Sequence, residues 1–155
     1  MYKIRTYSPS DALNLLSLFC QTIKNVNSRD YSLEQVNAWA NFEERKDSWA
    51  QTFINKEVWV CEGPDQLAGF CELRNDGYID RFYIDHKHIG QGVGRLLYDN
   101  LEGHAKSIAL KQLSVDASIT ARPFFKKMGF TNEEKQTVFI GKVAFTNFRM
   151  TKEIS

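Results

Sequence analysis

Three alternating glycines stand between an apolar run, Phe82–Ile84, and an amphipathic stretch, Leu96–Ile108. Glycine has no Cβ, so a bulky ligand can approach the backbone N–H groups of such a loop closely. The helix expected after the loop begins with unpaired N–H groups and the positive end of its dipole. A strand, a bare loop and a helix start in this order predict a cradle for a phosphate group. The residues of this cradle are Gly90, Gln91, Gly92, Val93, Gly94 and Arg95.

Several kinds of glycine loop bind phosphate, and the sequence separates them. A P-loop needs Gly-Lys-Ser/Thr, whereas Gly94 is followed by Arg95-Leu96, which excludes that class. A dinucleotide-binding turn needs Gly-x-Gly-x-x-Gly inside a βαβ unit. Here the third glycine comes one position early and the preceding strands are joined by hairpins, which disfavours that class. The alternative without a ligand is a tight strand-to-helix turn, for which one glycine would be enough.

The glycine loop resembles the signature of the GCN5-related N-acetyltransferases (GNAT), which is Gln/Arg-x-x-Gly-x-Gly/Ala at the start of the central helix. The matching window is Ile89–Gly94. The family's second block, Ala-x-x-Phe-Tyr-x-x-x-Gly-Phe, is similar to Ala121–Phe130. The two blocks together, in this order of strands and helices, are specific, and the resemblance extends from Met1 to the end of the chain. It implies acetyl-CoA as co-substrate and an amine as acceptor.

Two residues depart from the family pattern. Ile89 stands where the family usually has Gln or Arg, which removes one side-chain contact to the pyrophosphate region but leaves the backbone cradle. Phe125 replaces a tyrosine that often protonates the departing thiolate. A thiol has a reference pKa near ~8.5, so a thiolate leaves without a strong acid. The stretch Val115–Phe130 and the segment Phe145–Phe148 are similar to a bacterial subgroup of the family in which both substitutions are habitual.

The resemblance also implies how the co-substrate is held. The strand that ends at Phe82, Tyr83 and Ile84 would pair its backbone with the pantetheine arm and donate an N–H to the thioester oxygen. The neighbouring strand, Leu113–Asp116, would splay away to admit the co-substrate. Beyond the cradle and this strand, the implied cofactor-binding residues are Ser118, Phe124 and Phe125.

Acetyl transfer to an amine needs a group that accepts the amine proton, and two carboxylates on the expected central strands are candidate bases. These are Glu72 and Asp80. By the alternation of a regular strand, Asp80 shares a face with Phe82 and Ile84, where a charge needs a partner or a task. The alternative for Asp80 is a structural salt bridge, with candidate partners Arg5, Arg74 and Arg149. Asp116 is a third candidate base, for which we favour a capping or loop role beside Ser118.

Other polar and aromatic residues near these motifs have both a functional and a structural interpretation. Tyr83 and Tyr98 are candidate proton donors in place of Phe125, although core positions are typical of such residues. His86 and His88 lack a third ligand at metal spacing, so no metal site is expected. Trp39 and the loop Asn25–Tyr31 are candidates for the acceptor pocket. A solvated basic face or neutralisation of the co-substrate phosphates are the two interpretations of Arg95, Arg122, Lys126 and Lys127.

The composition is that of a globular protein without an extreme charge. The 155 residues are 43% hydrophobic and 25% charged, and the net charge of +1 gives no broad field for nucleic acid or an anionic membrane. No apolar run approaches the roughly 20 residues of a membrane span. No secretion signal is recognisable at the start, and the three cysteines are widely spaced. We therefore expect reduced thiols, a cytoplasmic location, no nucleic-acid or membrane partner, and a monomer or homodimer.

Periodicity and turn signals predict an α+β fold with a mixed, mostly antiparallel sheet of about seven strands and about four helices. A single acetyltransferase domain over residues 1–155 is expected, since no linker or repeat interrupts the pattern. A capping box at Ser32–Gln35 opens one of the helices, and Asp76-Gly77 marks a tight hairpin. Helices are expected after Ser8–Asp11, from Ser32 to Trp39, over Leu96–Ile108 and Ala121–Met128, with a further apolar-periodic patch at Trp49–Ile54. Strands are expected at Met1–Tyr7, Val58–Cys61, Leu67–Leu73, Tyr78–Ile84, Leu113–Asp116, Val138–Ile140 and Ala144–Met150.

The function indicated is acetyl transfer from acetyl-CoA to an amine of a small molecule or peptide. The alternative, motivated by Ile89 and Phe125, is a degenerate GNAT domain that binds CoA without catalysis. A nucleotide-dependent oxidoreductase rests on the glycines alone and is disfavoured.

Overall fold

The computed structural model describes residues 1–155, which build one seven-stranded sheet in the order β1-β2-β3-β4-β5-β7-β6. All neighbouring strands are antiparallel except β4 and β5, which are parallel. The expected class, an α+β fold around a mixed and mostly antiparallel sheet of seven strands, is confirmed. The strands are β1 (Lys3–Thr6), β2 (Lys56–Glu62), β3 (Leu67–Arg74), β4 (Tyr78–Ile84), β5 (Gln112–Ser118), β6 (Thr131–Ile140) and β7 (Val143–Glu153).

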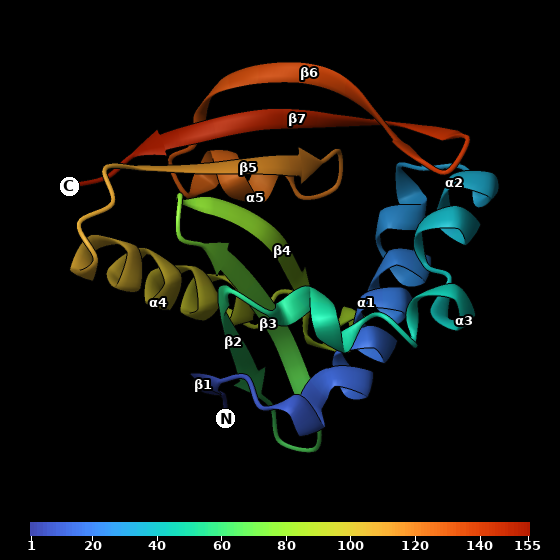
Figure 1. Cartoon of the computed structure of the whole chain (residues 1–155), viewed down its shortest axis with the longest axis horizontal. Helices are drawn as coiled ribbons and strands as arrows, with labels where there is room; N and C mark the ends of the chain where they lie inside the picture. The colour runs from blue at the N-terminus through green and yellow to red at the C-terminus, as the bar shows by residue number, and fades with distance from the viewer.

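Helices cover both faces of the sheet (Figure 1). One face carries α1 (Ala12–Asn25), α2 (Leu33–Trp39) and the single-turn α3 (Phe42–Arg45), and the other carries α4 (Val93–Ser107) and α5 (Arg122–Lys127). Four of these helices are longer than one turn, as expected. None of the helices is long and apolar enough to cross a bilayer.

Each layer has its own hydrophobic core. The α1-side cluster gathers Leu15, Leu16, Phe19 and Ile23, which repeat along one stripe of α1, against Phe70 and other strand residues. The α4-side cluster packs Leu97, Leu101 and Ala105 of α4 against the opposite face of the same strands. A strand residue can therefore be assigned to a face by the cluster that it joins.

A bulge interrupts β4 in the middle of the sheet. Cys71 pairs with Phe82 and Leu73 pairs with Ile79, so Glu72 alone opposes both Asp80 and Arg81. Ile79 and Phe82 accordingly pack on the same, α4-side cluster although three positions separate them. The extra residue turns Asp80 to the α1 side of the sheet.

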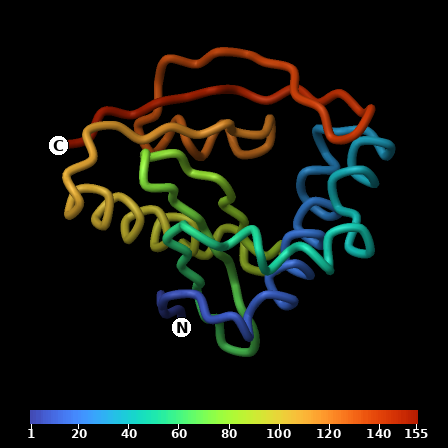
Figure 2. Tube along the Cα trace, viewed as in Figure 1, coloured from blue at the N-terminus to red at the C-terminus, as the bar shows by residue number.

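The sheet opens next to this bulge. Strands β4 and β5 pair only at Tyr78↔Ser114 and Ile79↔Val115, and the remainder of β4 has no partner on that side. Figures 1 and 2 show β5, β7 and β6 stacked at the top of the molecule while β4 curves away below them. The expected divergence of these two strands is confirmed.

Two segments differ from the sequence-based expectation. The patch Trp49–Ile54 forms only a 3-10 turn, η3 (Ala50–Phe53), and the helical turn of this region, α3, lies in the charged segment before it. Strands β6 and β7 are longer than expected. Because β6 is an edge strand whose first five residues are all exposed, its polar half carries no hydrophobic alternation that could have revealed it.

Candidate active site

The glycine loop has the backbone that a ligand cradle requires. Gly90 and Gly92 have φ of +80° and +85°, and a Cβ at either residue would meet nothing within 4 Å. A Cβ at Gly94 would instead lie 2.9 Å from the ring of Phe124. The first two glycines therefore leave space for a ligand, and the third allows α4 to pack closely against α5.

The start of α4 presents unpaired donors to that space. The first backbone hydrogen bond of the helix runs from Leu96 N to Gly92 O at 3.1 Å, so the N–H groups of Val93, Gly94 and Arg95 have no acceptor within the helix. The Arg95 side chain is 63% exposed, and its Nε lies 3.2 Å from Asp99 Oδ1. These donors and the helix dipole fit a phosphate group.

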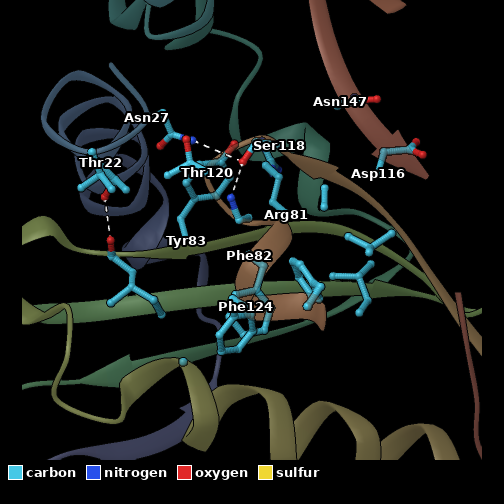
Figure 3. A pocket seen from close by; sticks show the side chains of 18 of the residues that line it. Thr22, Asn27, Arg81, Phe82, Tyr83, Asp116, Ser118, Thr120, Phe124 and Asn147 are labelled. Carbon is cyan, nitrogen blue, oxygen red and sulfur yellow. Dashed lines mark hydrogen bonds between the residues drawn. The ribbon is translucent and has the colours of Figure 1, made fainter. Parts of the chain in front are cut away.

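A cavity of about 660 Å³ runs from the glycine loop through the opening between β4 and β5 to the α1 side of the sheet. Its α4-side half is lined by the loop and by Phe82 and Phe124, whose ring centroids lie 5.2 Å apart. Its α1-side half is lined by residues of α1, α2 and the β6–β7 hairpin, as well as by Asp80, Arg81 and Asp116. The close-up view shows Phe82 and Phe124 together, with Asn27 and Ser118 across the cavity from them (Figure 3).

The open edge of β4 offers backbone groups to this cavity. Asp85 N donates to Ala68 O at 2.8 Å, so Asp85 and Ala68 form a hydrogen-bonded pair of the β3–β4 ladder. Such pairs alternate along an antiparallel ladder, and the next one is Tyr83 with Phe70. Tyr83 therefore bonds to β3, whereas the backbone groups of Phe82 and Ile84 point to the open side. The Ile84 carbonyl accepts from Thr22 Oγ1 at 2.9 Å. The Phe82 amide and carbonyl and the Ile84 amide remain available to an extended ligand.

Four charged residues form a charge cluster at the bulge, on the face opposite Phe82. They are Lys56, Glu72, Asp80 and Arg81. Glu72 is fully buried, with Oε1 2.7 Å from Lys56 Nζ and Oε2 accepting from Arg81 Nε. Lys56 Nζ also lies 2.6 Å from Asp80 Oδ2. The alternation that placed Asp80 beside Phe82 and Ile84 was wrong because of the bulge, and its salt-bridge partner is Lys56 rather than an arginine.

Arg81 is fixed by aromatic rings as well as by Glu72. Its guanidinium carbon lies 4.0 Å from the ring centroid of Trp49 and 4.9 Å from that of Phe53, and its side chain is 12% exposed. A hydrogen bond to Thr52 Oγ1 uses a further donor. Both Glu72 oxygens are thus committed to cations, and Glu72 does not line the cavity, whereas Asp80 does.

Asp116 lies on β5 at the edge of the cavity. Its Oδ1 accepts from Gln136 Nε2 at 2.8 Å and Arg149 Nε at 2.7 Å, and its Oδ2 accepts from the Tyr78 hydroxyl at 2.8 Å. The capping role that we favoured for Asp116 was wrong, since its partners lie on three other strands. Ser118 Oγ is the group that accepts a backbone N–H of this loop, from Ala121 at 3.0 Å.

The hydroxyl groups that could replace the missing tyrosine differ in access. Tyr98 lies outside the cavity and donates to Glu102 at 2.6 Å. Tyr83 lines the cavity and stacks on Phe70, and burial raises the pKa of its phenol well above the usual range. Phe125 is 2% exposed and packs edge-on against Phe82 and Phe130.

Of the remaining candidate residues, some line the cavity and others do not. Trp39 and part of the loop Asn25–Tyr31, the candidates for the acceptor pocket, line the cavity, and so do His88 and Lys127. Arg122 and Lys126 pair with Glu133 instead. Of the described residues, no group of three or more His, Cys, Asp or Glu has the arrangement of a metal site.

Several cavity residues were not predicted from the sequence, and Arg81 and Asn147 are the polar ones that matter most for the site. Arg81 escaped attention because only the bulge brings it beside Glu72. Asn147 escaped because its strand was taken as a closing element, although its position two residues after Phe145 marks it as sharing that residue's face.

The fold and the cavity define a class of enzyme, and the comparison with protein families agrees. A family model described as an acetyltransferase (GNAT) domain matches residues 27–152. The chain belongs to the GNAT family of N-acetyltransferases, which are acetyl-CoA-dependent acyltransferases.

The relatives confirm the resemblance to a bacterial subgroup. The chain is 36% identical to YafP of Escherichia coli (strain K12), named an uncharacterized N-acetyltransferase, over 96% of this chain and 93% of YafP. A GCN5-related N-acetyltransferase of Rhodopseudomonas palustris is 31% identical, with a TM-score of 0.93 over 98% of this chain and 95% of that one. The PaiA N-acetyltransferase of Thermoplasma acidophilum, solved in complex with coenzyme A, shares the fold at 19% identity, with a TM-score of 0.78 over 99% of both chains.

Proposed function

We propose that this protein transfers the acetyl group of acetyl-CoA to the amine of a small molecule. One observation carries the proposal. A single cavity joins an anion cradle on the α4 side to carboxylates on the α1 side, and it passes the open backbone edge of β4 between them. Two substrates that enter from opposite faces would meet at the bulge.

The chain's own groups would bind and orient acetyl-CoA, which supplies an acetyl group activated as a thioester. The amides of Val93, Gly94 and Arg95 would receive the pyrophosphate, in the space left by Gly90 and Gly92. The Phe82 and Ile84 backbone would pair with the extended arm, and a β4 amide would donate to the thioester oxygen. Phe124, Phe125 and Ser118 would form the surrounding wall.

Asp80 is the better placed of the two carboxylates to accept the amine proton. It lines the cavity, its side chain is 34% exposed, and its one ion-pair partner is Lys56, with Nζ 2.6 Å from Oδ2. Glu72 has no access to the cavity and acts as a positioning residue that fixes Lys56 and Arg81. Asp116 lies on the same face but is already held by three donors.

Departure of the thiolate would proceed without a tyrosine at residue 125. The thiolate is a tolerable leaving group at neutral pH, given a reference thiol pKa near ~8.5. Water in the cavity or the Tyr83 hydroxyl would supply the proton.

Two measurements test this function and separate it from a degenerate CoA-binding domain, the alternative that the buried Phe125 favours. Thermal shift with acetyl-CoA, CoA and NAD should show stabilisation by the first two only, because a ligand that binds the folded state raises the unfolding temperature. Thiol release over a panel of amines should then show turnover. Stabilisation by acetyl-CoA without acetylation of any amine would favour the degenerate domain.

A further inference from the structure

The α1-side half of the cavity has an apolar end and a polar end. Register partners on antiparallel strands present side chains to the same face. Asp116 pairs with Arg149, Ser118 pairs with Asn147, and Asn147 pairs with Gln136. The bonds from Arg149 and Gln136 to Asp116 confirm that this face is shared.

The apolar end lies where the β6–β7 hairpin approaches α2 (Figure 1). Residues two positions apart on a strand lie on the same face, so Phe145 shares the face of Asn147, and Val138 shares the face of Gln136. Tyr31 and Trp39 close this end, with ring centroids 5.9 Å from Phe145 in both cases. The Tyr31 hydroxyl is used by Thr146 O and Ile119 N, so it offers the cavity little beyond its ring. The apolar end consists of Tyr31, Trp39, Val138, Ile140 and Phe145.

The polar end offers acceptors that lack donors. Asn147 lines the cavity, and its Oδ1 is buried without a hydrogen-bond partner, so an amide rotation that turns Oδ1 toward the cavity breaks no hydrogen bond of that atom. The Asp116 carboxylate has about four acceptor sites and three donors, which leaves one site on Oδ2. Asp80 has Lys56 as its one ion-pair partner, and its side chain is 34% exposed. Figure 3 shows Asp116 and Asn147 together on the same side of the cavity.

These two ends are complementary to one kind of substrate that could accept the acetyl group. A protonated primary amine has three donors and one positive charge, which the acceptors Asn147 Oδ1, Asp116 and Asp80 would satisfy. The apolar end supplies no charged side chain to pair with a second charge, and burial of a charge without a partner is strongly unfavourable. The cations nearby are already paired, since Arg81 is bound by Glu72 and Arg149 by Asp116.

We propose that the acceptor is a primary monoamine carried on an apolar body, with Asn147 as a positioning residue for its ammonium group. This inference rests on the proposed acetyl transfer and specifies its acceptor. The apolar body lies against Phe145 and Val138, and the amine points toward Asp80 and the opening beside β4. Diamines and amino acids of the same length are disfavoured because their second charge would enter the apolar end.

A matched set of acceptors tests the proposal. Hexylamine, 1,6-diaminohexane and 6-aminohexanoate have the same chain length and differ only in the group at the far end. With acetyl-CoA, the kcat/KM measured by thiol release should be at least about 10-fold higher for hexylamine than for either of the others. An equal or higher value for the diamine or the amino acid overturns the proposal, while the acetyltransferase function itself stands.

Variants assign the preference to the two ends. Val138→Asn should reduce the preference for hexylamine over the diamine, because it places a polar group in the apolar end. Phe139→Thr is the matched control, since Phe139 neighbours Val138 on β6 but is 65% exposed on the opposite face. Asn147→Leu should raise KM for hexylamine several-fold with little change in kcat or in acetyl-CoA affinity. An unchanged KM in Asn147→Leu contradicts the role given to Asn147.

A binding measurement separates this proposal from the proposed function. In the presence of CoA, hexylamine should raise the unfolding temperature of the parent protein more than 1,6-diaminohexane does, whether or not turnover occurs. Amine binding with this order but no thiol release would overturn the acetyltransferase function and support the acceptor pocket. The absence of any shift by hexylamine, together with no preference in turnover, would overturn the acceptor pocket.

Discussion

Replacement of Glu72 by glutamine should destabilise the protein far more than it alters the chemistry directly. Glu72 is fully buried, and its two oxygens contact Lys56 Nζ and Arg81 Nε. Lys56 keeps a second partner in Asp80, but Arg81 keeps none and is only 12% exposed. The variant therefore leaves a buried guanidinium between Trp49 and Phe53 without a counter-ion.

The magnitude follows from that burial. Removal of one partner from a buried ion pair costs about 3–5 kcal/mol. For a chain of this size each kcal/mol lowers the unfolding temperature by about 2–4 °C, so Glu72→Gln should lower it by roughly 6–20 °C. Asp99→Asn is the control, because Asp99 and its partner Arg95 are both more than 60% exposed. Exposed i,i+4 pairs contribute about 0.3–0.5 kcal/mol, so this control should shift the temperature by about 2 °C or less.

Thermal and urea unfolding followed by circular dichroism, without ligand, give the required free energies of unfolding. Asp80→Asn should cost less than about 1 kcal/mol, since Asp80 is 34% exposed and Lys56 retains Glu72, yet turnover should fall about 100-fold or more. The reasoning is refuted if Glu72→Gln unfolds within about 1 kcal/mol of the parent while its kcat falls as steeply as that of Asp80→Asn. Glu72 would then act in the reaction rather than as a fixed partner of Arg81.

Three further predictions address the cradle, the acid stability and the missing tyrosine. Gly92→Val should abolish acetyl-CoA binding measured by calorimetry. The control Gly141→Val also places a side chain at positive φ (+59°), but it lies outside the cavity and should bind acetyl-CoA normally. Equal affinity in both variants would refute the assignment of the cradle. Burial acts to raise the pKa of Glu102, but hydrogen bonds donated by Lys152, Tyr98 and Lys106 outweigh it and lower that pKa from its ordinary 4.5 to about 2. A lowered carboxyl pKa stabilises the fold above pH 4.5, and this stabilisation is lost as the pH falls toward 2. In urea unfolding, Glu102→Gln should therefore lower the free energy of unfolding by about 3 kcal/mol at pH 7 and by almost nothing near pH 2. A cost that does not depend on pH would contradict the assignment. Phe125→Tyr should change kcat by no more than a few-fold if the thiolate leaves without an acid, and a large gain in an otherwise inactive protein would favour the degenerate domain.

The elements that carry the cradle were predictable because their signals are local. Alternate glycines before an amphipathic stretch specify the loop and the start of α4, and Asp76-Gly77 together with an apolar run gave the bounds of β4. The second block fixed α5 and its end, where Gly129 has φ of +100°. Each of these features depends on residues within a few positions of one another.

The α1-side half of the site was less predictable because its geometry is set between strands. The bulge in β4 exists only in register with β3, and strict alternation therefore placed Asp80 on the wrong face. Lys56, the partner of both Glu72 and Asp80, lies on β2, and nothing in its local sequence points to them. Gln136, which donates to Asp116, directly follows the exposed first half of β6, and that half has no hydrophobic pattern from which a strand could be predicted.

The most direct test of the central claim is the rate of thiol release from acetyl-CoA with hexylamine, measured across pH for the parent protein and for Asp80→Asn. The account predicts acetylated amine from the parent, identified by mass spectrometry. It also predicts that Asp80→Asn binds acetyl-CoA normally but loses turnover, most severely at low pH, where unprotonated amine is scarce. The account is contradicted if the parent binds acetyl-CoA and acetylates no amine, or if Asp80→Asn matches the parent rate at every pH.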